Sequence, residues 1–196
     1  MTSRWRVLIA TQREERAKLI EQALGVGQHR LVNVISLQDG LALGVQRAQP
    51  DALIIESADP VPGLLGQIRA VMDEHPLPIV VFADRSPAGD VRAAIKAGAS
   101  AYVVDGLESE RVLPILEAAM ARFTEFQALR IQRDEAVEKL AERRDVERAK
   151  GILMRRRDLA EQAAYDQLRK MAMDRGTRMI EVAKSIIAAE ELLAQH

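Results

Sequence analysis

The sequence contains no cysteine. Disulfide frameworks, thiol nucleophiles and thiolate metal sites are therefore excluded, and a reducing, cytoplasmic environment suits the chain. There is also no run of about 18 consecutive apolar residues, and the short apolar stretch near the N-terminus is interrupted by polar residues. We therefore expect neither a signal peptide nor contact with a membrane.

Motifs for catalysis and cofactor binding are missing as well. The histidines His29, His75 and His196 are scattered, and no glycine-rich loop ends in the Gly-Lys pair of a phosphate-binding loop. The adjacent Glu190 and Glu191 lie in a C-terminal stretch without a neighbouring acid–base group. We expect no catalytic residues, no metal site and no cofactor, and hence no enzyme activity.

The first part of the chain alternates short apolar runs with amphipathic stretches. The runs are too apolar for a half-exposed sheet, so they indicate parallel strands that are covered on both faces. The pattern predicts a doubly wound α/β domain with a five-stranded parallel sheet and a ligand crevice at the carboxyl ends of the strands. Strands are predicted at Arg6–Ala10, Leu31–Ile35, Ala52–Ile55, Ile79–Phe82 and Ala101–Val104, and helices near 14–24, 39–48, 63–74 and 88–97.

Glycine and proline become rare after Glu108, which predicts a long linker helix over residues 110–145 with Pro114 in its first turn. Apolar residues in this helix recur at the seven-residue spacing of a coiled coil, and Arg130 and Arg133 fall on the same seam. The alternative is that the first part of the helix packs on the α/β domain. We favour a coiled coil that forms a homodimer. The apolar positions are Leu116, Ala119, Phe123, Phe126, Val137 and Leu140.

The last segment, residues 144–196, combines a predicted interior with a basic surface. Breaks at Arg157–Asp158 and Gly176–Thr177 predict three helices, with Gly176 just past one helix end and Thr177 at the next start. From Arg144 to Lys184 there are eleven basic residues and seven acidic ones, which favours binding to a polyanion, and to RNA in particular. The expected interior residues are Ala149, Ile152, Leu153, Ala164, Leu168, Ala172, Ile180, Ala183 and Ile187.

The candidate RNA contacts are cations that can bind phosphate and an aromatic ring that can stack on a base. Tyr165 is the aromatic residue of the segment, and its spacing from Leu168 fits packing as well as stacking. The arginines at 155–157 also fit a solvated helix end. Gly151 inside a helix indicates the close approach of another helix or of an RNA backbone. The candidate set is Arg144, Arg148, Lys150, Arg155, Arg156, Arg157, Tyr165, Arg169 and Lys170.

The phrases PDALIIES, PIVVFAD and AGASAYVVDGL, together with the order of elements, resemble the receiver domain of two-component response regulators. The resemblance assigns residues 1–122 to a receiver domain, but one whose phosphorylation pocket is degenerate. Glu56 stands at the phosphoacceptor position, where a working receiver has an aspartate. Thr11 and Gln12 stand in place of the acidic pair that binds Mg²⁺, Ala83 in place of the hydroxyl residue, and Asp105 in place of the lysine.

These replacements predict that phosphotransfer is absent, because Mg²⁺ needs anionic oxygens and a phosphoryl group needs countercharge. One interpretation is that Glu56 permanently imitates a phosphorylated aspartate. We favour a solvated glutamate at the sheet edge, since no neighbouring lysine or hydroxyl is expected to respond to its charge. The domain is then expected to serve as a protein-binding module.

Three blocks of the last segment, AKGILM, AAYDQLRKMAM and MIEVAKSII, closely resemble the ANTAR domain in residues and spacing. The resemblance implies an RNA-binding antiterminator that binds paired hairpins of a leader mRNA, usually as a dimer, so that an overlapping terminator cannot form. DNA is not expected as a ligand, because residues 177–193 are too apolar and acidic for a recognition helix. Ala160 stands where the family often has a capping hydroxyl, and Asp158 is expected to provide the cap instead.

A degenerate receiver joined by a helix to this domain is similar to the AmiR/NasT family. The stretch AYVVDGLESERVLPILEAAMARFTEFQALR looks most like the nitrate- and nitrite-responsive NasT type. That resemblance implies a partner, a nitrate-sensor protein of the NasS type, which sequesters the regulator until nitrate or nitrite releases it. The alternatives are an AmiR-type regulator of another small ligand, a phosphorylation-dependent DNA-binding response regulator, and a scaffold that touches no nucleic acid.

Overall fold

The computed structural model describes residues 4–58, 63–86 and 89–193 of the chain. The chain divides into two compact units, Met1–Gln127 and Ala128–His196, each with its own hydrophobic core. One long helix, α5 (Ser109–Arg157), contributes to both units. Within the described part of the chain, no helix is long and apolar enough to cross a membrane.

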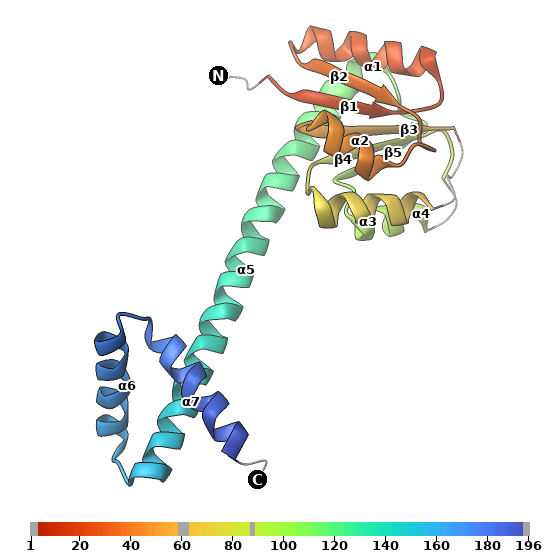
Figure 1. Ribbon diagram of the computed structural model, residues 1–196. Coiled ribbons are helices and arrows are strands. Elements are labelled where there is room, and N and C mark those ends of the chain that lie inside the picture. The colour runs from red at the N-terminus through yellow and green to blue at the C-terminus, as the bar shows by residue number, and fades with distance from the viewer. Residues whose placement is uncertain (1–3, 59–62, 87–88, 194–196) are drawn as a thin grey trace. The chain divides into compact units, whose positions relative to one another are not determined.

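The first unit contains a parallel sheet of five strands in the order β2-β1-β3-β4-β5, which confirms the predicted fold class. The ladders are in parallel register, with Val7 opposite Ala52 and Leu53 opposite Ile79. Four further helices connect the strands (Figure 1). The strands are β1 (Arg6–Ala10), β2 (Arg30–Ile35), β3 (Ala52–Ser57), β4 (Ile79–Ala83) and β5 (Ala101–Val104), and the helices are α1 (Glu14–Val26), α2 (Leu41–Ala48), α3 (Leu64–Glu74) and α4 (Asp90–Ala97).

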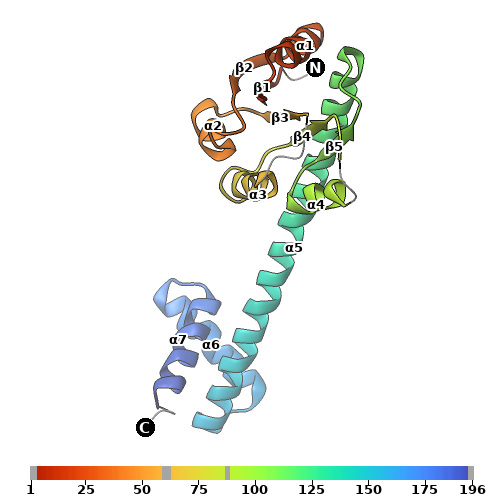
Figure 2. The ribbon, with the colours of Figure 1, turned by 90° about the vertical axis from the view of Figure 1, so that its right-hand side faces the viewer.

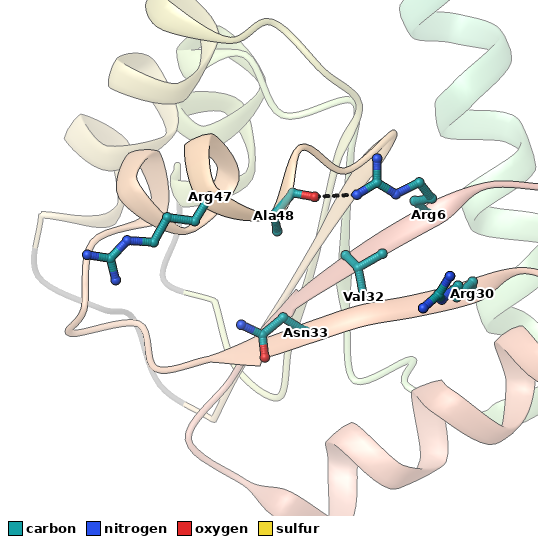
Figure 3. A pocket seen from close by; sticks show the side chains of 6 residues that line it. All are labelled: Arg6, Arg30, Val32, Asn33, Arg47 and Ala48. Carbon is teal, nitrogen blue, oxygen red and sulfur yellow. Dashed lines mark hydrogen bonds between the residues drawn. The ribbon is translucent and has the colours of Figure 1, made fainter.

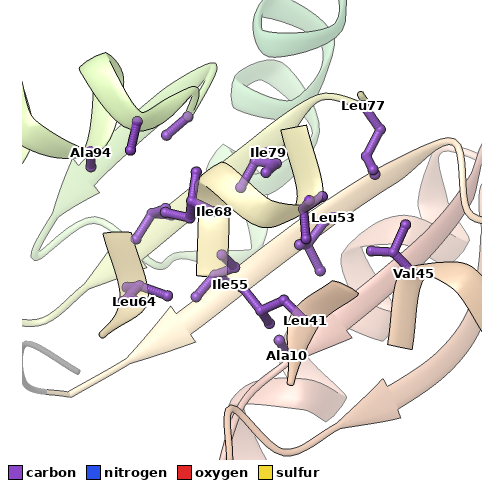
Figure 4. Close-up of a cluster of buried hydrophobic side chains, with 14 of the residues drawn as sticks. Ala10, Leu41, Val45, Leu53, Ile55, Leu64, Ile68, Leu77, Ile79 and Ala94 are labelled. Carbon is purple, nitrogen blue, oxygen red and sulfur yellow. The ribbon is translucent and has the colours of Figure 1, made fainter. Parts of the chain in front are cut away.

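The two faces of this sheet carry separate cores, because successive side chains of a strand point to opposite faces. Leu8 and Ala10 of β1 pack in the core beneath α2, α3 and α4 (Figure 4). Val7 and Ile9 of the same strand pack in the core beneath α1 and the start of α5. Both faces are therefore buried, as the nearly continuous apolar runs of the strands indicated.

The apolar residues of the seven-residue pattern in α5 are buried in the first part of the helix and exposed in the next. Leu116 and Ala119 are fully buried against the sheet, so the first part of α5 packs on the α/β unit, which was the alternative to a coiled coil. From Phe126 to Leu140 the large apolar side chains are exposed. Pro114 lies in the second helical turn and not in the first as predicted, because α5 already begins at Ser109. The exposed residues are Phe126, Leu129, Ile131, Val137 and Leu140.

The second unit consists of the last part of α5 with α6 (Glu161–Arg175) and α7 (Met179–Leu193) (Figure 2). All nine residues predicted for its interior are buried, and Val182 joins them. The unit is thus built around alanines, which let helices approach closely. Gly176, at φ +62°, ends α6, and the N–H of Thr177 donates to the carbonyl oxygen of Ala172 at 3.0 Å, as in a Schellman motif.

Asp158 does not cap α6, and this prediction is wrong. The residue adopts a left-handed conformation, with φ +51°, and terminates α5. The N–H of Leu159 donates to the carbonyl oxygen of Met154 at 3.2 Å, which closes that helix end. The N-cap of α6 is Ala160, which makes no side-chain capping hydrogen bond.

Candidate nucleic-acid interface and the altered receiver pocket

Two of the candidate RNA contacts are arginines of α5 that form ion pairs with α7. Arg148 lies 2.8 Å from a carboxylate oxygen of Glu191, and Arg156 lies 2.9 Å from one of Glu190. Both arginine side chains are more than half exposed. Exposed pairs of this kind contribute only about 0–1 kcal/mol, so a phosphate can replace the carboxylate at little cost.

Lys150 is placed differently from the other cations. Its side chain is only 9% exposed, and its Nζ lies 2.7 Å from Glu147 and 2.8 Å from Glu161. The hydrogen bonds to Glu147 and Glu161 raise the pKa of Lys150, and the same contact lowers the pKa of Glu161. Lys150 therefore joins α5 to the beginning of α6. Its burial argues against the predicted phosphate contact.

The remaining candidates lie on the surface. Tyr165 is 38% exposed, so its ring is neither fully packed nor fully free. The other five remaining candidates are cations whose side chains have no ion pair or hydrogen bond with any other residue that the structure describes. Their charges are therefore available to a ligand. These cations are Arg144, Arg155, Arg157, Arg169 and Lys170.

Gly151 does not mark the close approach of a second helix. A Cβ atom at this position would meet only the guanidinium of Arg155, at 3.7 Å. The interpretation as a helix contact is therefore wrong. The glycine instead leaves an open position on α5, between the exposed Arg148 and Arg155.

Glu56 is not a solvated residue at the sheet edge, and that prediction is wrong. It lies in β3, the central strand, where it is 1% exposed. The hydroxyl of Thr11 donates a hydrogen bond to one of its carboxylate oxygens, so a hydroxyl neighbour does exist. Among the described residues, neither Gln12 nor Asp105 makes a hydrogen bond to this carboxylate, and Ala83 has no polar side chain. Gln12 and Asp105 are exposed, and Ala83 is buried at the end of β4.

The charge of Glu56 is neutralised by Arg13, a residue that the sequence analysis did not single out. The guanidinium of Arg13 contacts both carboxylate oxygens of Glu56, with a hydrogen bond of 3.3 Å from Nε to Oε2. It also donates from Nη1 to Asp84 at 2.6 Å, and this hydrogen bond lowers the pKa of Asp84. Arg16 lies 3.6 Å from the other oxygen of Asp84. The crevice thus holds an internal ion-pair network.

A cavity of about 400 Å³ lies beside β2, the edge strand at the other end of the sheet from β5. Figure 3 shows the guanidinium of Arg6 donating to the carbonyl oxygen of Ala48, at 2.7 Å, while Arg47 extends from α2 away from Arg6. The arginines do not converge on a common point, so they do not form an anion site. The lining residues are Arg6, Arg30, Val32, Asn33, Arg47 and Ala48.

With this geometry in place, comparisons with known proteins assign the chain to a family. Residues 134–187, which fall in the second unit, match the ANTAR domain. The transcriptional regulatory protein PdtaR of Mycobacterium tuberculosis is 32% identical over 139 residues, which cover 71% of this chain and 68% of that protein. The chain belongs to the ANTAR-domain family of transcriptional regulators. Both the matched family and this relative are regulatory.

Two further similarities cover only part of this ANTAR-domain regulator. The nitrate regulatory protein of Klebsiella oxytoca is 42% identical over 53 residues, which are 27% of this chain but only 13% of that protein. The signal receiver domain of the response regulator NarL from Mycobacterium tuberculosis superposes with a TM-score of 0.52 and 18% identity, covering 60% of this chain and 98% of that domain. This second match shows the receiver fold of the α/β unit.

The Mg²⁺ ion that a receiver fold implies does not fit the crevice of this ANTAR-domain regulator. Two carboxylates of the described part of the crevice, Glu56 and Asp84, are both bound by Arg13. A second cation next to that guanidinium would meet like-charge repulsion. Among the described residues, no group of three or more histidine, aspartate or glutamate side chains is arranged to hold a metal ion.

Proposed function

We propose that this regulator is an RNA-binding antiterminator that binds a leader transcript with two hairpins and prevents formation of a terminator. The observation that carries the proposal is the overlap between the ANTAR match, residues 134–187, and a compact helical unit with unpaired surface cations. The proposed phosphate contacts are Arg144, Arg148, Arg155, Arg156, Arg157, Arg169 and Lys170, with Tyr165 as the stacking residue.

The proposed active form is a homodimer. Phe126, Leu129, Val137 and Leu140 are all more than half exposed, although large apolar side chains repeated along one helix are typical of a packed seam. A second copy of α5 supplies a matching apolar surface. A dimer carries two ANTAR units, so it can hold two hairpins at once.

Control of the proposed antiterminator is by a partner protein and not by phosphate. Arg13 pairs with both Glu56 and Asp84, which makes these two carboxylates poor acceptors for a phosphoryl group. We propose a nitrate-sensor protein of the NasS type as that partner and nitrate assimilation operons as the targets. The similarity of 53 residues to a nitrate regulatory protein supports this assignment.

The test of RNA binding is an electrophoretic mobility shift with a leader RNA that carries two short-loop hairpins. Replacing Arg155, Arg156 and Arg157 together by alanine is expected to weaken binding at least tenfold. The slope of log affinity against log salt should also fall, by roughly 0.7–0.9 for each phosphate contact that is lost.

A matched control removes three exposed cations of the α/β unit, Arg47, Arg92 and Lys96, and should leave the shift unchanged. Duplex DNA of the same sequence should bind only weakly. If the DNA binds better than the RNA, the chain is a DNA-binding regulator. If neither nucleic acid binds, it is a scaffold, and an unaltered shift with the triple variant removes the three arginines from the interface.

The proposed control by a sensor is tested by adding a purified NasS-type protein to the same binding reaction. The nitrate-free sensor should abolish the RNA shift, and nitrate or nitrite should restore it, because the ligand shifts the sensor to a form that releases the regulator. Equal RNA binding with and without the nitrate-free sensor would remove this mechanism. Release by a different small molecule would indicate an AmiR-type response.

A further inference from the structure

A cavity of about 470 Å³ opens in the second unit, where α5, α6 and α7 meet. We call it the Tyr165 groove. One part of its lining is apolar and combines the Tyr165 ring with Val146 and Ile180. The other part is charged and comes from α5 and from Arg178, just before α7. The complete lining is Lys139, Glu142, Arg143, Val146, Glu147, Tyr165, Arg178, Met179 and Ile180.

The charges of this groove are unevenly compensated. Glu142 lies 3.4 Å from Arg178, and Glu147 lies 2.7 Å from Lys150. Both acidic groups of the lining are therefore already paired. Lys139 and Arg143 are exposed and have no ion pair or hydrogen bond within the described residues. The mouth of the groove thus carries two positive charges without a counterion.

The ring and the hydroxyl of Tyr165 are also available to a ligand. Tyr165 stands next to the apolar lining with 38% of its surface exposed, and its hydroxyl has no hydrogen-bond partner among the residues the structure describes. An aromatic ring with one open face, beside apolar side chains, accepts a flat aromatic ligand by stacking. Cations beside the ring bind a phosphate that is attached to such a ligand.

We propose that the Tyr165 groove binds one unstacked base of an RNA hairpin loop, with Lys139 and Arg143 on the phosphates that flank it. This inference rests on the proposed RNA binding and adds the site for the loop base. It also adds two cations that lie outside the candidate set 144–170. The charge distribution favours a nucleotide over a helix of a second copy, because such a helix would have to bring its own carboxylates to the two free cations.

The experiment uses full-length protein and hairpin RNAs with a fixed stem and a randomised short loop, from which the tightest binder is enriched. Each loop nucleotide of that hairpin is then made abasic in turn. One abasic position should weaken binding to the wild type about tenfold or more. Tyr165→Ala should weaken the intact hairpin by a similar factor and should be insensitive to the same abasic position, whereas Tyr165→Phe should behave like the wild type.

Two further variants test the cations without disturbing the core. Lys139→Ala and Arg143→Ala should each weaken all hairpins alike and lower the salt slope by about 0.7–0.9. Arg175→Ala, an exposed cation outside the groove, is the matched control and should have little effect.

The possible failures are distinguishable. If no hairpin is enriched, the proposed RNA binding fails and the groove assignment fails with it. If a hairpin binds but Tyr165→Ala keeps the penalty at every abasic position, the groove assignment is overturned and RNA binding stands. If Tyr165→Ala or Arg143→Ala converts a dimer to a monomer in sedimentation and leaves affinity for a single hairpin unchanged, the groove holds a second copy of the chain.

Discussion

Arg13→Ala is expected to lower the free energy of unfolding of the α/β unit by about 3 kcal/mol. Glu56 is 1% exposed, and the variant would leave its carboxylate in the core with only the hydroxyl of Thr11 as a partner. Removal of one member of a buried ion pair typically costs about 3–5 kcal/mol, and we expect the lower end because Arg13 itself is 32% exposed. Urea unfolding of the full chain, followed by the fluorescence of Trp5, measures the change.

Trp5 is a suitable reporter because it is the only tryptophan of the chain and stacks on His29 with ring centres 4.4 Å apart. Arg13→Ala combined with Glu56→Gln should recover part of the loss, since the double variant no longer buries an unpaired charge. Arg92→Ala, at an exposed site on α4, should change stability by less than about 0.5 kcal/mol. A loss equal to that of Arg92→Ala would show that Glu56 does not depend on Arg13.

Val137→Glu combined with Leu140→Glu is expected to convert the proposed dimer into a monomer and to weaken binding of a two-hairpin RNA about 100-fold. Both side chains are about 60% exposed, so the substitutions cost the isolated chain little. In a dimer they would place like charges on the apolar seam. The large effect on RNA follows because the second hairpin binds intramolecularly only when two ANTAR units are joined.

Sedimentation velocity and RNA titration test this expectation together. Val26→Glu, an equally polar change at a valine of α1 that is 82% exposed, is the control and should alter neither the mass nor the affinity. A single hairpin should bind the monomeric variant as well as it binds the wild type. If the variant stays dimeric, or if it loses affinity for one hairpin as well, the exposed residues of α5 do not serve as the dimer seam.

The fold was accessible from sequence because its signals are local. Continuous apolar runs identified every strand of the sheet to within two residues, and Gly176 marked the end of α6 through its left-handed conformation. The Asp158 prediction failed for a related reason. Aspartate is common both as an N-cap and in left-handed conformations, and sequence alone does not say which neighbouring helix it serves.

The receiver crevice was harder to predict, because its partners are far apart in the chain. Arg13 and Glu56 are separated by 43 positions, and Arg13 and Asp84 by 71. Family comparison directs attention to the positions of the missing acidic pair and lysine, and Arg13 is none of these. One signal was available: Glu56 continues the apolar run of β3, and a buried acid in a central strand requires a cationic partner.

The roles of the individual cations in the basic segment were also difficult to predict from sequence. A count of charges treats all its cations as equivalent, but Lys150 is buried between two carboxylates and Arg144 is free. Glu161, the second partner of Lys150, lies on the next helix, so this pairing depends on how α5 and α6 pack. Lys139 and Arg143, the two cations of the proposed groove, lie outside the predicted set because they precede the richest run of arginines.

The ion pairs of Arg13 also limit how the α/β unit could acquire the phosphorylation chemistry of a working receiver in evolution. Glu56→Asp alone would shorten the acidic side chain beneath a guanidinium that still occupies the crevice. Loss of Arg13 alone would leave a buried charge without a partner. Each single step is therefore unfavourable, and because an aspartate at position 56 would carry the same buried charge, neither step makes the other easier. A chain that carries both Arg13 and Glu56 is therefore held to this ion pair, which suits the proposed control by a partner protein.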